Sequence, residues 1–161
     1  MKVIIMGISG CGKTTIGKEL EKILDNYKFI EGDDYHPIEN KDKMKNGIPL
    51  NDEDREIWLK NLLIDVEKEI NVIVSCSLLK KSYRDFFIKD DMILVYIKVS
   101  NNSFNIIKQR IENRGGHFFN VNLLKSQFET LEEPTNANLT VEFNESINNI
   151  IIKIEQFVLK K

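Results

Sequence analysis

Gly7-Ile8-Ser9-Gly10-Cys11-Gly12-Lys13-Thr14 fits G-x-x-x-x-G-K-[ST], the pattern of a phosphate-binding loop. An apolar run precedes the loop, and a segment with apolar residues at helical spacing follows it. Average residue usage gives such an octapeptide roughly one chance in two hundred in a chain of this length, before the flanking strand and helix are required. The pattern therefore predicts a strand, a loop and a helix that together bind a nucleotide.

The residue types of this loop suit a bound triphosphate. Glycines let backbone N–H groups turn toward phosphate oxygens, and a helix that starts near Lys13 directs its positive end at them. We expect Lys13 to contact the β- and γ-phosphates of ATP and the hydroxyl of Thr14 to ligate Mg²⁺. A strand–turn–helix corner without a ligand is the alternative interpretation. The predicted ATP-binding residues of the loop are Gly7, Ile8, Ser9, Gly10, Cys11, Gly12, Lys13, Thr14 and Thr15.

Short apolar runs alternate with longer segments of helical periodicity along the chain, which is typical of parallel strands joined by helices. A helix capped by Asn51 or Asp52 is predicted to have an apolar face that continues to Ile70, and a last helix is predicted near Glu145 to Leu159. We expect one α/β domain over residues 1–161, with a five-stranded parallel sheet flanked by helices in three layers. The predicted strands are Lys2–Met6, Lys28–Glu31, Val72–Cys76, Ile93–Val99 and Leu139–Phe143.

Composition argues against several classes of protein. The chain has 23 Lys and Arg against 25 Asp and Glu, so no basic surface for nucleic acid or a membrane is expected. Its two cysteines, Cys11 and Cys76, have neither zinc-ligand spacing nor the density of a disulfide framework. The first apolar run is too short for a signal peptide, and no stretch approaches the roughly 18 residues of a membrane span. We expect a cytoplasmic protein.

A carboxylate near the γ-phosphate is expected from the acceptor side of the site. Many ATPases end a second apolar strand with an aspartate, but Val72-Ile73-Val74 continues into Ser75-Cys76-Ser77. This favours a small kinase over a motor or switch. Asp33 and Asp34 follow the second strand at the sheet edge where open α/β sheets bind ligands. Either could accept the proton of an acceptor hydroxyl, although a solvated acidic turn would have the same spacing.

Two groups of cations are candidates for contact with anionic ligands. Lys80 and Arg84 lie four residues apart on a predicted helix beside the cleft, and Arg55 lies in the first turn of the Asp52 helix. Arg110 and Arg114 end another helix before Gly115-Gly116, which predicts a hinged lid around residues 110–125 that excludes water. Solvated surface charges and a basic helix end are the alternatives.

Several motifs, in order along nearly the whole chain, resemble the gluconokinase family. The first half carries Gly32-Asp33-x-x-His36-Pro37, Lys43-Met44, Gly47-x-Pro49-Leu50-Asn51-Asp52 and Asp54-Arg55-x-x-Trp58-Leu59. The second half carries Cys76-Ser77-x-Leu79-Lys80-Lys81-x-Tyr83-Arg84-Asp85, Arg114-x-Gly116-His117-Phe118 and Ser126-Gln127-Phe128-Glu129-Thr130-Leu131-Glu132. Leu78 departs from the pattern, where alanine is usual, and is expected to alter the fit of the acceptor.

The resemblance implies transfer of the ATP γ-phosphoryl group to the 6-hydroxyl of D-gluconate, for sugar-acid catabolism, on a nucleoside-monophosphate-kinase-like fold. It implies that Asp33 is the base or the carboxylate that orients the acceptor, and that the segment around residues 32–58 binds the acceptor. It also implies that this chain forms a homodimer, as members of the family tend to do. His36, Arg55, Lys80 and Arg84 would surround gluconate. Arg110 would bind ATP from the lid, to which catalytic Arg114 and substrate-binding His117 would also belong. The alternatives are a kinase for another small hydroxy acid, such as shikimate, and a nucleotide-binding regulator without turnover.

Overall fold

Five parallel strands form one sheet in the order β2-β3-β1-β4-β5. We describe them from a computed structural model that covers residues 1–113 and 121–161. On the central strand, Ile4 is paired with Val74 of β3 on one side and with Leu94 of β4 on the other. The predicted parallel sheet is confirmed. The fourth strand begins and ends one residue earlier than expected, and the fifth ends one residue earlier. The strands are β1 Lys2–Met6, β2 Lys28–Glu31, β3 Val72–Cys76, β4 Met92–Lys98 and β5 Leu139–Glu142.

Helices connect the strands and cover both faces of the sheet. No helix among residues 1–113 and 121–161 is long and apolar enough to cross a membrane. The α-helices are α1 Lys13–Ile23, α2 Ile38–Lys45, α3 Asp52–Lys68, α4 Lys81–Phe87, α5 Phe104–Asn113, α6 Val121–Thr130 and α7 Ile147–Leu159. Two 3₁₀ turns, η1 Gly32–Tyr35 and η2 Asn101–Ser103, are also present.

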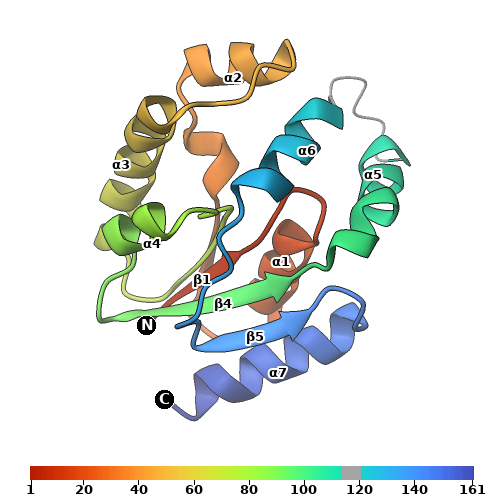
Figure 1. Cartoon of the computed structure of the whole chain (residues 1–161). Helices are drawn as coiled ribbons and strands as arrows, with labels where there is room; N and C mark the ends of the chain where they lie inside the picture. Colours follow the sequence, from red (N-terminus) through yellow and green to blue (C-terminus); the bar gives the residue numbers. More distant parts are fainter. Residues whose placement is uncertain (114–120) are drawn as a thin grey trace.

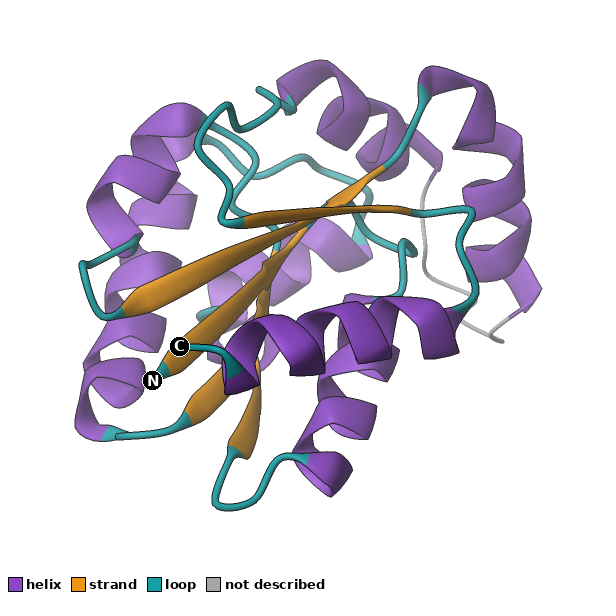
Figure 2. Cartoon of the chain, turned by 90° about the horizontal axis from the view of Figure 1, so that it is seen from below, coloured by secondary structure: helices purple, strands orange, loops and turns teal. Residues whose placement is uncertain are grey.

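The alternation of side chains along each strand divides the interior into two cores. On β1, Val3 and Ile5 join a cluster built with α1, α5, α6 and α7, whereas Ile4 and Met6 join a second cluster built with α3 and α4. Every residue of β1 is buried, as expected for a strand covered on both faces. The predicted three layers are confirmed, and Figure 2 shows α7 lying across the sheet.

The helix that begins at Asp52 is capped as predicted. The Asn51 side chain accepts a hydrogen bond from the Asp54 N–H at 2.8 Å, and the Asp54 carboxylate accepts one from the Asn51 N–H at 3.0 Å. The expectation that Ile70 belongs to its buried face is wrong, because the helix ends at Lys68 and Ile70 is 83% exposed. The buried face of α3 ends at Val66.

The loops that follow β1, β2 and β3 meet at one edge of the sheet. The phosphate-binding loop leaves β1, the central strand, where the direction of the connections reverses. Open α/β sheets bind ligands at such a point. Figure 1 shows α2 and α6 above the sheet and α7 below it.

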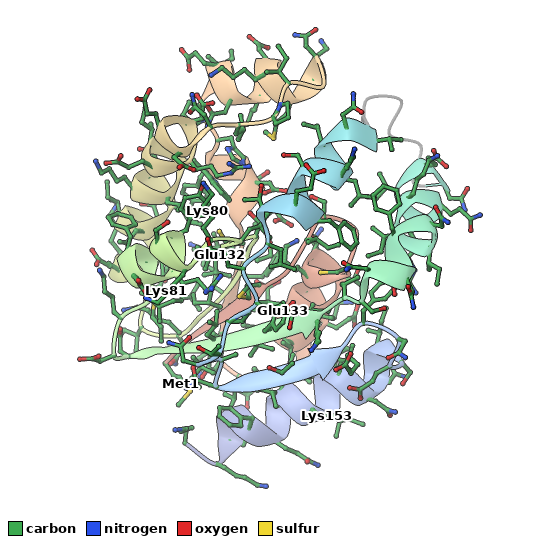
Figure 3. The ribbon with its side chains drawn as sticks, viewed as in Figure 1. Met1, Lys80, Lys81, Glu132, Glu133 and Lys153 are labelled. Carbon is green, nitrogen blue, oxygen red and sulfur yellow. The ribbon has the colours of Figure 1, made fainter. Side chains whose placement is uncertain are left out.

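After α6 the chain passes beside the start of α4. There Glu132 donates its N–H to the Leu79 carbonyl at 2.9 Å, and its carboxylate accepts a hydrogen bond from the Lys81 N–H at 2.6 Å (Figure 3).

Candidate active site

A cavity of about 500 Å³ opens at this edge of the sheet. The phosphate-binding loop forms one part of its lining, and residues from β2 through α3 form another. The β3–α4 loop, α5 and α6 complete it. The lining residues are Ser9, Gly10, Gly12, Lys13, Thr14, Glu31, Asp33, His36, Met44, Lys45, Pro49, Leu50, Arg55, Trp58, Ser77, Leu79, Ile111, Leu123, Ser126 and Gln127.

The phosphate-binding loop needs its glycines for both conformation and space. Gly10 and Gly12 have φ angles of 80° and 107°, in the left-handed region that L side chains rarely adopt. A Cβ at Gly10 would lie 2.8 Å from the Ile107 side chain on α5. Helix α1 then begins at Lys13, so its first N–H groups face the cavity. The Lys13 ammonium donates to the Ile8 carbonyl at 3.0 Å.

Not every predicted ATP-binding residue borders the cavity. Five of the nine line it: Ser9, Gly10, Gly12, Lys13 and Thr14. The loop residues Gly7, Ile8 and Cys11 are buried and do not line the cavity. Thr15, in the first turn of α1, is half-buried and also lies outside the lining. The loop therefore presents one side to the cavity and packs the other into the core.

Glu31 is a cavity residue that the sequence reasoning missed. Its carboxylate accepts a hydrogen bond from the Thr14 hydroxyl at 2.6 Å and another from the hydroxyl of Ser75, which is the buried β3 residue beside it. The motifs direct attention to the end of β3, where no aspartate is present, and to Asp33 and Asp34, which follow β2. Glu31 ends β2 at the same edge of the sheet, and that position was the signal available.

Asp33 and His36 lie together in the lining, whereas Asp34 does not line the cavity. The Asp33 side chain is 68% exposed, and its carboxylate lies 3.9 Å from His36 Nε2. His36 is stacked on Trp58 with ring centroids 4.1 Å apart, and the Trp58 indole N–H donates to the Gly32 carbonyl at 2.7 Å. Burial, helped by the positive charges of Lys41 and Arg55, lowers the pKa of His36 to about 4. His36 is therefore neutral at neutral pH.

Arg55 is the predicted acceptor-binding cation that lines the cavity. Its guanidinium donates to the Tyr83 hydroxyl at 3.4 Å and lies 5.8 Å from the centroid of the Tyr83 ring. Tyr83 in turn donates to Asp52, and Lys80 forms an ion pair with the same Asp52 at 2.6 Å. Lys80, labelled in Figure 3, therefore supports the start of α3 and does not line the cavity.

Two expectations about the β3–α4 loop need correction. Arg84 is only 6% exposed and donates to the carbonyls of Leu78 and Leu79, each at 3.0 Å, so it holds the loop from inside and lies outside the cavity lining. Leu78 is fully buried in the core shared with α3 and α4. Its neighbours Ser77 and Leu79 line the cavity, so the Leu78 side chain packs in the core and does not contact an acceptor there.

The predicted lid is described only in part. Arg114 and His117 lie outside the described residues. Arg110 is exposed, with its guanidinium 4.4 Å from the centroid of the Phe143 ring, and does not line the cavity. Helix α6 does reach the cavity, where Gln127 accepts the Ser9 backbone N–H at 2.7 Å and donates to the Ser9 hydroxyl at 2.9 Å. Spacing alone could not have found this contact across 118 residues of sequence.

Comparisons with known proteins agree on one family. A family profile described as an AAA domain matches residues 3–118. The chain is 42% identical to the thermosensitive gluconokinase of Escherichia coli (strain K12), over 97% of this chain and 86% of that protein. It is also similar to the crystal structure of a gluconokinase from Sinorhizobium meliloti 1021, at 34% identity and a TM-score of 0.85, covering 99% of this chain and 91% of that one.

A more distant likeness extends to shikimate kinase from Aquifex aeolicus. That structure is 16% identical with a TM-score of 0.60, covering 99% of this chain and 97% of that one, so the two share a fold. The nucleoside-monophosphate-kinase-like architecture is thus common to enzymes with different acceptors. The residues that line the cavity beyond the phosphate-binding loop must decide which acceptor is bound.

Proposed function

The chain belongs to the gluconokinase family, and we propose that it transfers the γ-phosphoryl group of ATP to the 6-hydroxyl of D-gluconate, giving 6-phospho-D-gluconate and ADP. One observation carries the proposal. The phosphate-binding loop lines the same cavity as Asp33, His36 and Arg55, which are three of the acceptor-side residues that the family's motifs imply. Its volume of about 500 Å³ is in the range of small-molecule sites.

The phosphate side of the site binds and orients ATP. The N–H groups at the start of α1 and the Lys13 ammonium, which lines the cavity, hold the phosphates. Thr14 and Glu31 fit Mg²⁺, because a hydroxyl and a carboxylate lie 2.6 Å apart and Mg²⁺ prefers oxygen ligands. When bound, Mg²⁺ would offset the negative charge of the triphosphate.

The acceptor side activates and orients the hydroxyl. Asp33 accepts the proton of the 6-hydroxyl while the oxygen of that hydroxyl forms a bond to the γ-phosphorus. The bond from the γ-phosphorus to the β,γ-bridging oxygen breaks, and ADP leaves. Arg55 pairs with the gluconate carboxylate through its forked donors, supported by Tyr83 behind it. His36 donates to a gluconate oxygen. Catalysis consists mainly of positioning and charge stabilisation.

The deciding experiment is an acceptor panel. ADP release is measured with magnesium ATP and either D-gluconate, shikimate or no acceptor, and kcat/KM is compared. We expect strong dependence on gluconate and only background release with shikimate. A higher kcat/KM for shikimate would replace the proposal by the hydroxy-acid alternative. ATP binding without acceptor-dependent ADP release would favour a nucleotide-binding regulator.

The remaining family properties are part of the same proposal. Arg110, Arg114 and His117 act from a lid over residues 110–125, with Arg114 stabilising the transferred phosphoryl group. The chain forms a homodimer and works in the cytoplasm, where the buried Cys11 and Cys76 stay reduced. Sedimentation equilibrium tests the dimer, and a monomer at micromolar concentration would contradict it.

A further inference from the structure

The orientation of one buried amide can be read from its partners. Asn40, on α2, is 3% exposed, and its Nδ2 lies 2.8 Å from the backbone carbonyl oxygen of Asp54 on α3. A carbonyl oxygen can only accept a hydrogen bond. The Asn40 atom that faces it must therefore be the nitrogen, and the amide cannot be turned over without placing two oxygens against each other.

The same nitrogen also lies 3.3 Å from Nδ1 of His36. An amide NH₂ has two hydrogens, so one bonds Asp54 and the other is available to His36. His36 Nδ1 must then accept, and in a neutral imidazole the proton is on Nε2. Stacking on Trp58 at an interplanar angle of 20° fixes the ring plane, and Asn40 fixes which nitrogen faces inward.

We propose that Asn40 is a positioning residue that holds His36 in its Nε2–H tautomer and so presents an N–H donor to the acceptor hydroxyl beside Asp33. The Nε2 atom lies 3.9 Å from the Asp33 carboxylate, which is too long for a direct hydrogen bond. The Nε2–H group of His36 can therefore donate a hydrogen bond to an oxygen of the phosphoryl acceptor. The inference rests on the proposed function only in the identity of that oxygen, as a gluconate hydroxyl.

The charges around His36 are consistent with a neutral ring. The charged groups that face it are Asp33 on η1, Lys41 on α2 and Arg55 on α3, and the two cations disfavour an imidazolium. Asp54 offers only its backbone carbonyl to Asn40, because its carboxylate is paired with Lys43 at 2.7 Å. Without Asn40, no hydrogen bond described at His36 Nδ1 would select the tautomer.

Nitrogen NMR tests the tautomer directly. The chain has two histidines, so a long-range ¹H–¹⁵N spectrum of labelled protein contains two imidazoles, and a His117→Gln variant assigns them. We expect His36 at neutral pH to show a protonated Nε2 and an unprotonated Nδ1. A protonated Nδ1 would overturn the proposal. This measurement needs no acceptor, so it stands even if the acceptor panel excludes gluconate.

Asn40→Asp supplies the kinetic test. The new carboxylate cannot donate to the Asp54 carbonyl, so some stability is lost. It can accept from Nδ1, so His36 should switch to the Nδ1–H tautomer and present a lone pair to the cavity at about pH 9, well above the ordinary histidine pKa. We expect the KM for gluconate to rise about tenfold, the loss of one hydrogen bond, with the KM for ATP unchanged. An unchanged gluconate KM in a variant whose tautomer has switched would overturn the role.

Asn46→Asp is the matched control. Asn46 lies at the end of the same helix, is exposed, and also donates its Nδ2 to a carbonyl, that of Asp42 at 2.8 Å. It introduces the same charge outside the cavity lining, so the gluconate KM and the His36 spectrum should stay as in the wild type. If Asn40→Asp does not fold, the wild-type spectrum still decides the proposal.

Discussion

Replacement of Glu31 by glutamine tests whether this carboxylate helps to hold Mg²⁺. The variant keeps the size of the side chain and removes its charge, while Thr14 and Ser75 keep a polar neighbour. A hydrogen bond to a charged partner contributes about 1.5–3 kcal/mol, roughly 1 kcal/mol or more above a neutral one. Loss of a carboxylate that orients a metal ligand typically lowers metal affinity about 10–100-fold. We expect a rise of that size in the free Mg²⁺ needed for half-maximal rate.

The assay measures initial ADP production against free Mg²⁺ at saturating ATP and gluconate. Binding of ATP without metal is followed separately by the fluorescence of Trp58, the only tryptophan, which lines the cavity. We expect that metal-free affinity to be equal or slightly higher in Glu31→Gln, because a negative charge is removed. Glu145→Gln is the control, since Glu145 accepts from Lys153 outside the cavity lining. An unchanged Mg²⁺ dependence in Glu31→Gln would refute the reasoning.

Asp33→Asn should lower kcat by a factor on the order of 100 or more with the KM for ATP little changed. Asp34→Asn, at a position outside the cavity lining, should keep a near-normal kcat. Equal losses of kcat in the two variants would contradict the assignment of the base. The pKa of His36 falls from 6.5 to about 4 on folding, so between these values the unfolded chain binds a proton that the folded chain does not. The free energy of unfolding should therefore be highest above pH 6.5 and decrease as pH falls toward 4. Urea unfolding should show a loss of about 3 kcal/mol over that range that is absent from His36→Phe, and identical pH curves would speak against it. Leu78→Ala should lower the free energy of unfolding by about 2–5 kcal/mol with the gluconate KM unchanged, because Leu78 is fully buried in the core; a changed KM would return it to the acceptor site. Gln127→Glu can still accept the Ser9 N–H but places a negative charge beside the phosphate-binding loop, so the KM for ATP should rise about tenfold. The control is Gln109→Glu at an exposed position, which should leave this KM unchanged. A wild-type KM in Gln127→Glu would limit Gln127 to a structural role.

The local patterns predicted well wherever neighbouring residues along the chain carry the signal. The loop at residues 7–14, the five strands and the cap at Asn51 can be predicted from short segments, because each depends on residues within one turn or one strand. Hydrophobic periodicity extends the predicted helix face too far, to Ile70, because it does not mark where the chain leaves the helix. The backbone turn after Lys68 decides that boundary.

The charged residues were harder to place. Lys80, Arg84 and Arg55 have similar spacing and similar charge, yet only Arg55 lines the cavity. Lys80 pairs with Asp52 and Arg84 bonds two carbonyls of its own loop. A long cationic side chain can reach partners in several directions, so its partner depends on the packing of α3 against α4 and not on spacing.

The amino-acid sequence by itself determined the phosphate-binding loop, the parallel sheet and the family, because each is encoded in contiguous residues or in short motifs that follow one another along the chain. Only the tertiary structure decided that Glu31 joins Thr14, that Gln127 holds Ser9 and that Asn40 selects the tautomer of His36 through Asp54. The reason is physical. These contacts join residues on different elements, and a hydrogen bond with a range of about 3 Å exists only after the sheet has brought those elements together.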